Sequence, residues 1–299
     1  MEQHSEFRRR DLQLTEVEEH HAPEDVARVY GRIKETLRAN VVNFVWRVLA
    51  AKPAFLEAVW NQLEPAVDEG FLEAADAIRA AAIERVREAQ TIPDQRTLLG
   101  DDLHEAVQQL RVFLEVNPRL LVLTSALRLS WEQGEIGGAR EAVATQRGIP
   151  EWHPDIATEE SPSGELAKVY DDIRETLDLP APNTDYKALG RFPDYFVPAW
   201  RDLRAFIGNE AWSSAVRTIE WTAKQIAVAL PARIDVSPKR AGELGLADHE
   251  LDEVASWIRV FDEILPGLIV NTSYLWIGMN GGEEAVKAQG HPSFEKPPG

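Results

Sequence analysis

The hydrophobic positions of this chain follow a helical period almost throughout. Residues 26–37 carry apolar side chains at the i, i+3, i+4 and i+7 positions of an amphipathic helix, and residues 166–177 repeat this spacing. The strict alternation that is typical of half-buried strands is essentially missing. The pattern therefore predicts an all-α fold.

Several further helices are predicted from the same pattern. Residues 54–95 and 103–116 are rich in Ala, Glu, Leu and Arg and are predicted to be helical. Two strongly apolar helices are predicted over residues 118–134 and 266–280, each opening at a proline. Because they are the most apolar segments of the chain, we expect them to lie at the centre of the molecule.

The chain repeats itself over long distances. Residues 27–60 match residues 167–200 at an offset of 140 without a gap, and residues 111–127 match residues 259–275 at an offset of 148. A period this long is not that of a solenoid, whose repeats span about 20–50 residues. We expect a duplicated half-domain folded as an internal pseudo-dimer with the site between its halves, divided into a first repeat (22–137), a linker (138–164), a second repeat (165–285) and a C-terminal tail (286–299).

Composition narrows the classes of partner and chemistry. The 299 residues are 44% hydrophobic, which allows a sizeable core, and the net charge of −18 makes nucleic acid and anionic membranes poor partners. The absence of cysteine excludes disulfides and thiolate chemistry. The chain carries no evident signal peptide, so a cytoplasmic location is expected. Arg8-Arg9-Arg10 is interpreted as part of a solvated tail.

The familiar catalytic and metal-binding motifs are missing. His20-His21, which follow Glu18-Glu19, come nearest to a metal cluster. Adjacent residues do not face one another on a helix, so these histidines are interpreted as a solvated helix entry. We predict neither a metal ion nor a cofactor.

The two copies differ at two positions where chemistry could reside. The second copy has Asp185 where the first has Val45, and the first copy has Asn117 where the second has Leu265. A buried carboxylate or amide costs free energy unless it is partnered, so one asymmetric site between the halves would explain the difference. Two alternatives stay open. Asn183 or Thr184 could be an N-cap, with Asp185 simply favoured in the first helical turn, and Asn117 before Pro118 could be a helix cap.

The order and spacing of these segments resemble those of the group I 2-haloacid dehalogenases, a cofactor-free, all-helical family with a pseudo-dimeric repeat. The resemblance rests on Tyr30–Pro53, on Asn117-Pro118 with the apolar helix behind it, and on Asn183-Thr184-Asp185-Tyr186. It implies hydrolysis of short 2-haloalkanoic acids to 2-hydroxy acids and halide. The partners implied are this substrate and water, and a homodimer stays open.

The resemblance also implies roles for single residues. Asp185 would be the base that activates a water for direct, inverting attack on C2, and Asn117 would help to place that water or the substrate. An Asn at position 183 resembles the D-selective members, whereas members that accept both enantiomers have Ala there. The substrate pocket implied by the resemblance comprises Val41, Phe44, Leu120, Asn183, Thr184, Phe261 and Leu265.

Two of these positions depart from the family pattern, which has Trp where this chain has Val41 and Tyr where it has Phe261. Both changes would make the pocket larger or less polar. The alternative hypothesis is therefore a non-catalytic helical protein of the same architecture that binds a small ligand with Asp185 and Asn117. A substrate carboxylate could be received by the free N–H groups at a helix start near Asn183–Tyr186.

Overall fold

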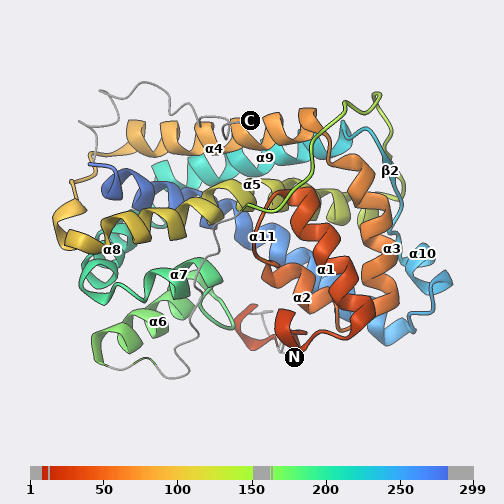
Figure 1. Ribbon diagram of the computed structural model, residues 1–299, viewed down its shortest axis with the longest axis horizontal. Coiled ribbons are helices and arrows are strands. Elements are labelled where there is room, and N and C mark those ends of the chain that lie inside the picture. The colour runs from red at the N-terminus through yellow and green to blue at the C-terminus, as the bar shows by residue number, and fades with distance from the viewer. Residues whose placement is uncertain (1–8, 13, 151–161, 163, 282–299) are drawn as a thin grey trace, which may run out of the picture.

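The computed structural model describes residues 9–12, 14–150, 162 and 164–281, and it is mostly helical (Figure 1). Before the linker the helices are α1 (Glu24–Leu37), α2 (Phe44–Leu49), α3 (Pro53–Leu63), α4 (Glu69–Ala89) and α5 (Leu103–Gln133). After it they are α6 (Gly164–Leu177), α7 (Thr184–Leu189), α8 (Pro193–Phe206), α9 (Glu210–Val228), α10 (Pro238–Glu243) and α11 (Asp248–Met279). Short 3-10 turns are η1 (Arg9–Asp11), η2 (Glu19–His21), η3 (Glu64–Ala66), η4 (Arg96–Leu98) and η5 (Gly100–Asp102).

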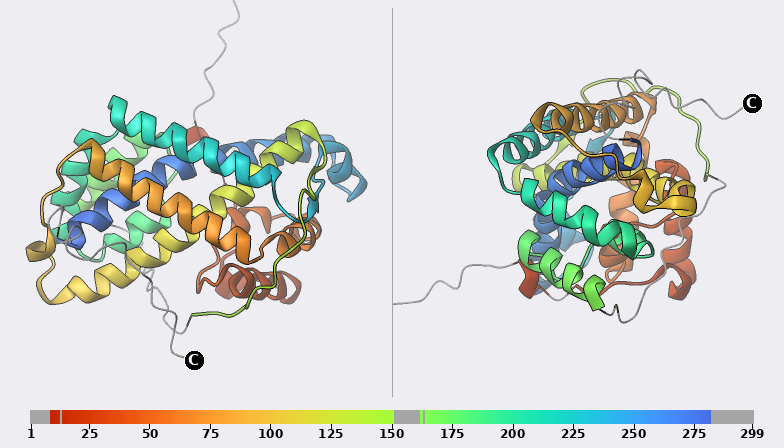
Figure 2. Two further views of the ribbon diagram at one scale, coloured as in Figure 1. Left: turned by 90° about the horizontal axis from the view of Figure 1, so that it is seen from above. Right: turned by 90° about the vertical axis from the view of Figure 1, so that its left-hand side faces the viewer.

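The helices are arranged around α5 and α11, which are packed against each other through the middle of the molecule. α1, α2 and α3 lie on one side of this pair and α6, α7 and α8 on the other (Figure 1). α4 and α9 run side by side over a third face (Figure 2). The expectation that residues 118–134 and 266–280 are central is confirmed, since both ranges lie in the buried parts of α5 and α11.

The starts of three helices recur at the offset found in the sequence. α1, α2 and α3 begin at residues 24, 44 and 53, and α6, α7 and α8 begin at 164, 184 and 193. α1 and α6 end in the same way, because Arg38 and Asp178 both take up the left-handed conformation just after them, with φ of 47° and 50°. Equivalent residues therefore adopt equivalent local structure.

The aromatic core recurs as well. Trp46 and Trp60 meet edge to face with ring centroids 5.3 Å apart, and their counterparts Tyr186 and Trp200 do so at 5.7 Å. Trp60 and Trp200 are almost completely buried, as expected for core residues rather than for a substrate platform. Such aromatic pairs contribute about 0.5–1.5 kcal/mol beyond the burial of their area.

Two predicted helix boundaries are wrong. Pro118 and Pro266 do not open new helices. They lie inside α5 and α11, which are single helices of 31 and 32 residues. An interior proline removes one backbone hydrogen bond and strains the preceding turn. The residues on both sides of each proline are buried, and this packing holds the two segments in one helix. Asn117 is consequently in mid-helix and is not a cap.

Other boundaries also differ from the sequence pattern. The range 54–95 is divided by η3, where Pro65 interrupts the period, and its last residues are not helical. The linker leaves the first half through a short antiparallel pairing of β1 (Ile136–Gly137) with β2 (Arg233–Ile234). Arg140 then binds the buried Asp68, so the described part of the linker is attached to the body. Most of the linker's second half and the C-terminal tail lie outside the described residues.

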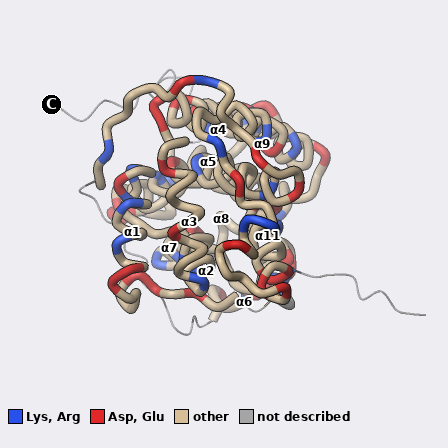
Figure 3. The backbone as a smooth tube through the Cα atoms, turned by 90° about the vertical axis from the view of Figure 1, so that its right-hand side faces the viewer, with Lys and Arg blue, Asp and Glu red and all other residues tan. Residues whose placement is uncertain are grey.

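Charged side chains are distributed over the molecule. Lys and Arg positions are interspersed with Asp and Glu positions rather than gathered in one region (Figure 3). Arg9 and Arg10 were predicted to be solvated, but both form ion pairs with Asp178. Among the described residues, no helix is at once long and apolar enough to cross a membrane.

Candidate functional site

One cavity of about 210 Å³ is lined by the starts of α2 and α7, the loop 179–182 before α7, the middles of α5 and α11, and the N-terminal segment. We define the N-terminal segment as residues 9–12 and 14–21. Eight of the nine residues singled out in the sequence line this cavity: Phe44, Asn117, Leu120, Asn183, Thr184, Asp185, Phe261 and Leu265. The ninth, Val41, does not. It is buried just before the start of α2 and is not among the lining residues, so its role in the pocket stays a prediction.

Asn117 and Asp185 meet in the lining of the cavity. The Asn117 Nδ2 donates a hydrogen bond of 2.7 Å to Asp185 Oδ2. Their exposed fractions are only 2% and 3%. Burial raises the pKa of Asp185 to about 7, and the hydrogen bonds from Asn117 and from its own backbone oppose this shift. A carboxyl group with this pKa can exchange a proton near neutral pH, as a general base must.

The capping alternatives are not supported by the contacts. Asn43 and Asn183 stand at the N-cap positions of α2 and α7, yet neither side chain makes a capping hydrogen bond. Both side chains line the cavity instead. Asp185 is in the first turn of α7, but its carboxylate is buried and bonded to Asn117 rather than solvated at the helix end. These side chains are therefore available to a ligand.

The positions that correspond to Asp185 and Asn117 in the other copy are apolar. Val45 and Leu265, the counterparts of Asp185 and Asn117, also line the cavity. The structure therefore places a polar pair and an apolar pair around one cavity. Such an arrangement gives a small ligand one preferred orientation, because its polar and apolar ends meet different walls.

Aromatic side chains form part of the apolar wall. Phe44 of α2 and Phe261 of α11 meet edge to face with centroids 5.6 Å apart. The guanidinium carbon of Arg47 lies 5.7 Å from the centre of the Phe44 ring. Phe44 thus contacts both an aromatic ring and a cation, and these contacts restrain the ring.

Sequence reasoning missed two cations that line the cavity, Arg47 and Lys187. Their positions are equivalent at the offset of 140, so a comparison of charges between the two copies could have found them. It also missed Leu14 and Glu16 of the N-terminal segment. No pattern in the sequence indicates that this segment folds back onto the cavity.

Buried polar contacts support the site from behind. Tyr186, next to Asp185, accepts a hydrogen bond of 2.9 Å from Asn271 of α11, and Trp212 of α9 donates to the same amide at 2.8 Å. This chain of contacts orients the first turn of α7 against two other helices. Every member has a partner, as is required of buried polar groups.

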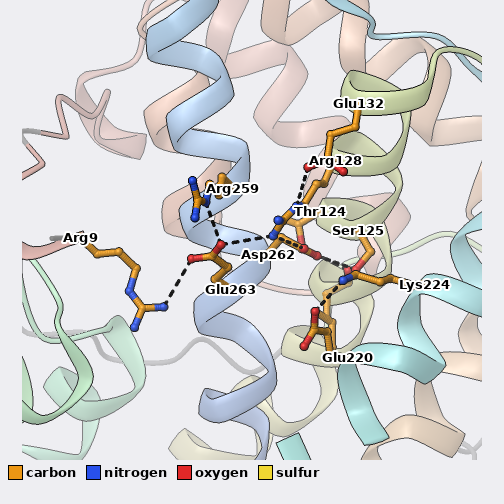
Figure 4. Close-up of polar contacts among 11 residues, drawn as sticks. Arg9, Thr124, Ser125, Arg128, Glu132, Glu220, Lys224, Arg259, Asp262 and Glu263 are labelled. Atoms are coloured by element: carbon orange, nitrogen blue, oxygen red, sulfur yellow. Dashed lines mark hydrogen bonds and ion pairs between the residues drawn. The ribbon is translucent and has the colours of Figure 1, made fainter. Parts of the chain in front are cut away.

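A second buried network joins α11 to α5 beside the cavity wall (Figure 4). Asp262 follows the lining residue Phe261, and its carboxylate accepts hydrogen bonds from Ser125 at 2.6 Å and from Arg128 at 3.2 Å. Burial raises the pKa of Asp262. Its neighbour Glu263 also pairs with Arg9, so this part of α11 is connected to the N-terminal segment.

The histidines near the N-terminus form an exposed cluster with Glu18. His20 and His21 both approach the Glu18 carboxylate at 3.2 Å, and the two rings lie 4.0 Å apart. The expectation that they would not face one another is wrong, because η2 is a tight 3-10 turn rather than an α-helix. The three could reach one metal ion, but they lie on the surface and do not line the cavity.

Comparisons with known proteins show similarity to one family of enzymes. Residues 40–186 match the family model described as "Halocarboxylic acid dehydrogenase DehI". An (R)-2-haloacid dehalogenase of Pseudomonas putida is 29% identical over 276 residues, which cover 86% of this chain and 90% of that protein. These matches support an assignment to the 2-haloacid dehalogenase family. A configuration-inverting 2-haloacid dehalogenase of Alcaligenes xylosoxydans xylosoxydans is 23% identical over 271 residues, or 87% of this chain and 91% of that protein.

Solved structures of the family share the fold. A D-2-haloacid dehalogenase mutant in complex with D-2-CPA superposes with a TM-score of 0.85 at 26% identity, covering 89% of this chain and 96% of that one. A complex of D-2-haloacid dehalogenase with L-LA gives a TM-score of 0.84 at the same identity and coverage. The chain therefore shares the overall fold of these structures.

Proposed function

We propose that this protein is a 2-haloacid dehalogenase that hydrolyses short D-2-haloalkanoic acids to 2-hydroxy acids, with inversion at C2. The observation that carries the proposal is the buried Asn117–Asp185 pair, which opens onto a cavity of a size suited to a small acid. Relatives named (R)-2-haloacid dehalogenase, and others named as configuration-inverting, support the reaction and its stereochemistry.

In the proposed mechanism Asp185 is the general base. Its ionised carboxylate removes a proton from a water molecule while the water oxygen forms a bond to C2 of the substrate. The carbon–halogen bond breaks on the opposite face, halide leaves with the bonding electron pair, and C2 is inverted. Asp185 then returns the proton to solvent. A positioned base typically contributes roughly 10²–10⁴-fold to such a rate.

Asn117 has a positioning role in this proposal. Its amide donates to one carboxylate oxygen of Asp185, which restrains the side chain and favours its ionised form. The remaining lone pairs of the carboxylate can then accept from water. Restraint of the base matters because misplacement of reacting atoms by about an ångström can cost on the order of 10²-fold in rate.

Asn183 is proposed as the residue that selects the D enantiomer. It lines the cavity two residues before Asp185, and its amide is not engaged in capping α7. The side chain therefore occupies space beside the base that Ala would leave open. Water needs access to the face of C2 opposite the halogen, and that face differs between the two enantiomers.

We also propose that the halves arose by duplication and are related by a pseudo-twofold axis, with the first repeat spanning 22–137 and the second 165–285. The recurring helix starts and the recurring aromatic pairs support this. Superposition of α1–α3 and the end of α5 on α6–α8 and the end of α11 tests it.

A cytoplasmic location and assembly as a homodimer are further proposals, to be tested by fractionation and by light scattering.

Halide release tests the proposed reaction. The purified protein is mixed with D- and L-2-chloropropionate, chloride is measured, and the chirality of the lactate is determined. We expect chloride from the D form and L-lactate as the product. A protein that binds 2-chloropropionate in a titration but releases no chloride would be the non-catalytic binder instead.

A further inference from the structure

The cavity lining carries positive charge in addition to the Asn117–Asp185 pair. Arg47 of α2 and Lys187 of α7 are the cations among the lining residues, and they occupy equivalent positions in the two copies. The lining carboxylates are Asp185 and Glu16. An entering carboxylate would add a second negative charge near the proposed base, and a cation is needed to offset it.

Neither cation is fully engaged within the described residues. Lys187 makes no hydrogen bond or ion pair there, and burial together with the charge of Arg47 lowers its pKa while Glu16 raises it. Arg47 Nε lies 3.0 Å from Glu16 Oε2. Both atoms are nevertheless buried without a hydrogen bond, so the N–H of Arg47 is not directed at this oxygen.

Asn43 adds a third unsatisfied group. It lines the cavity one turn before Arg47, the residue is 8% exposed, and its Oδ1 is buried without a hydrogen-bond partner. The oxygen and nitrogen of an amide are interchangeable in such an assignment, so Asn43 can present a donor to a ligand. Asn43 and Arg47 each have a buried polar atom without a hydrogen-bond partner, and Lys187 has no partner among the described residues, so all three can pair with a bound ligand.

We propose that Arg47 and Lys187, assisted by Asn43, bind the carboxylate of the substrate, and that Glu16 occupies Arg47 until the substrate replaces it. The inference rests on the proposed function, since it takes the ligand to be a halocarboxylate. It differs from the helix-start N–H groups expected from the sequence, because the charge now comes from side chains. An ionic hydrogen bond of this kind is about twice as strong as a neutral one.

Glu16 is positioned as a competitor by the N-terminal segment. The segment is attached to the first half, where Val17 N–H donates to the Arg47 carbonyl at 3.0 Å and Tyr30 donates to the Val17 carbonyl at 2.7 Å. At its other end Arg9 N–H donates to Asp178 at 2.9 Å in the second half. The Glu16 carboxylate is therefore held at the cavity beside Arg47, where a substrate carboxylate would have to displace it.

Steady-state kinetics separate binding from chemistry. Arg47→Gln and Lys187→Gln should each raise KM for D-2-chloropropionate on the order of 10- to 100-fold, with kcat within a few-fold of the unmodified enzyme. Arg47→Lys retains the charge and should give a smaller rise. The matched control is Lys168→Gln on the exposed face of α6, for which KM should not change. Unchanged KM in both cavity variants would overturn the proposal.

Substitution of Glu16 should change KM in the opposite direction from substitution of Arg47 or Lys187. Glu16→Gln should lower KM several-fold, because the substrate no longer competes with an internal carboxylate. The same substitution in an Arg47→Gln background should have no further effect on KM. A rise in KM on Glu16→Gln alone would show that Glu16 assists binding, and the assignment of Glu16 as competitor would be wrong.

A binding measurement without turnover distinguishes this proposal from the proposed function. Propionate and the neutral propionamide are titrated calorimetrically into the Asp185→Asn protein at pH 7.5. We expect propionate to bind, propionamide not to bind, and Arg47→Gln to abolish the difference. If no variant releases halide but this pattern holds, the anion site stands and the dehalogenase proposal fails. If halide is released but substitution of Arg47 and Lys187 leaves the affinity for propionate unchanged, the proposed anion site is wrong and the dehalogenase proposal is unaffected.

Discussion

Asn117 and Asp185 are 68 positions apart in sequence and are joined by a buried hydrogen bond of 2.7 Å. Asn117 belongs to α5 of the first half, and Asp185 belongs to α7 of the second. Neither half therefore contains the pair by itself. The contact ties the ionisation of the proposed base to the packing between the halves.

Asp185→Asn should reduce kcat by at least about 10²-fold, because the amide cannot accept a proton from water. Halide release with saturating D-2-chloropropionate measures the loss. The control is Asp171→Asn on the exposed face of α6, which should keep full activity. Substantial turnover by Asp185→Asn would exclude Asp185 as the base.

The same substitution should change how stability depends on pH. The pKa of Asp185 is raised by burial from 3.8 to about 7 in the folded protein. The neutral form is thus favoured by folding, and its contribution to stability is present below the unfolded pKa and lost as pH rises through about 7. Asp185→Asn should raise the thermal midpoint at pH 8 and change it little at pH 4, as followed by circular dichroism. An equal shift at both values would contradict the burial of an ionisable carboxyl.

The pH profile of kcat/KM should have a rising limb with a midpoint near 7, because Asp185 must be ionised to act as a base. Asn117→Ala removes a hydrogen bond that favours the ionised form, so its midpoint should move to higher pH and its maximal rate should fall. Initial rates over pH 5–9 measure both effects. Asn61→Ala on α3, remote from the cavity, should leave the midpoint in place. A fall in rate without a shift in midpoint would mean that Asn117 acts only on the substrate or the water.

Asn183→Ala should admit the L enantiomer. The unmodified enzyme is expected to consume D-2-chloropropionate and to leave the L form largely untouched, since the Asn amide occupies space in the cavity beside Asp185. Rates for the separate enantiomers before and after substitution provide the measurement. Equal rates for both enantiomers in the unmodified enzyme would refute Asn183 as the selector without affecting the role of Asp185.

A single turnover in ¹⁸O-water with enzyme in excess should place the label directly in the 2-hydroxy acid. Direct attack by water requires this, because the new C2–O bond takes its oxygen from solvent. Mass spectrometry of the product and of the peptide that contains Asp185 distinguishes the routes. Label in the Asp185 carboxylate and unlabelled product would demonstrate a covalent ester intermediate instead.

The sequence by itself determined the helical class, the helical stretches that contain α1 and α6, the repeat at an offset of 140, and the two positions at which the copies differ in polarity. These follow from local periodicity and from comparison of one half with the other, and neither needs knowledge of distant contacts. Eight of the nine residues selected in this way line one cavity, although their functional roles await the experiments above.

Only the tertiary structure showed that α5 continues through Pro118, that Val41 is not among the cavity-lining residues, and that the N-terminal segment lies against the cavity. Packing on both sides of Pro118 keeps α5 continuous, and no local propensity encodes that packing. The sequence did not reveal that Glu16 lies 3.0 Å from Arg47, because their approach depends on the path of a segment with little periodicity. The contact between Asn117 and Asp185 likewise arises only when two helices from different halves are packed together, and it is this burial that brings the pKa of Asp185 to about 7.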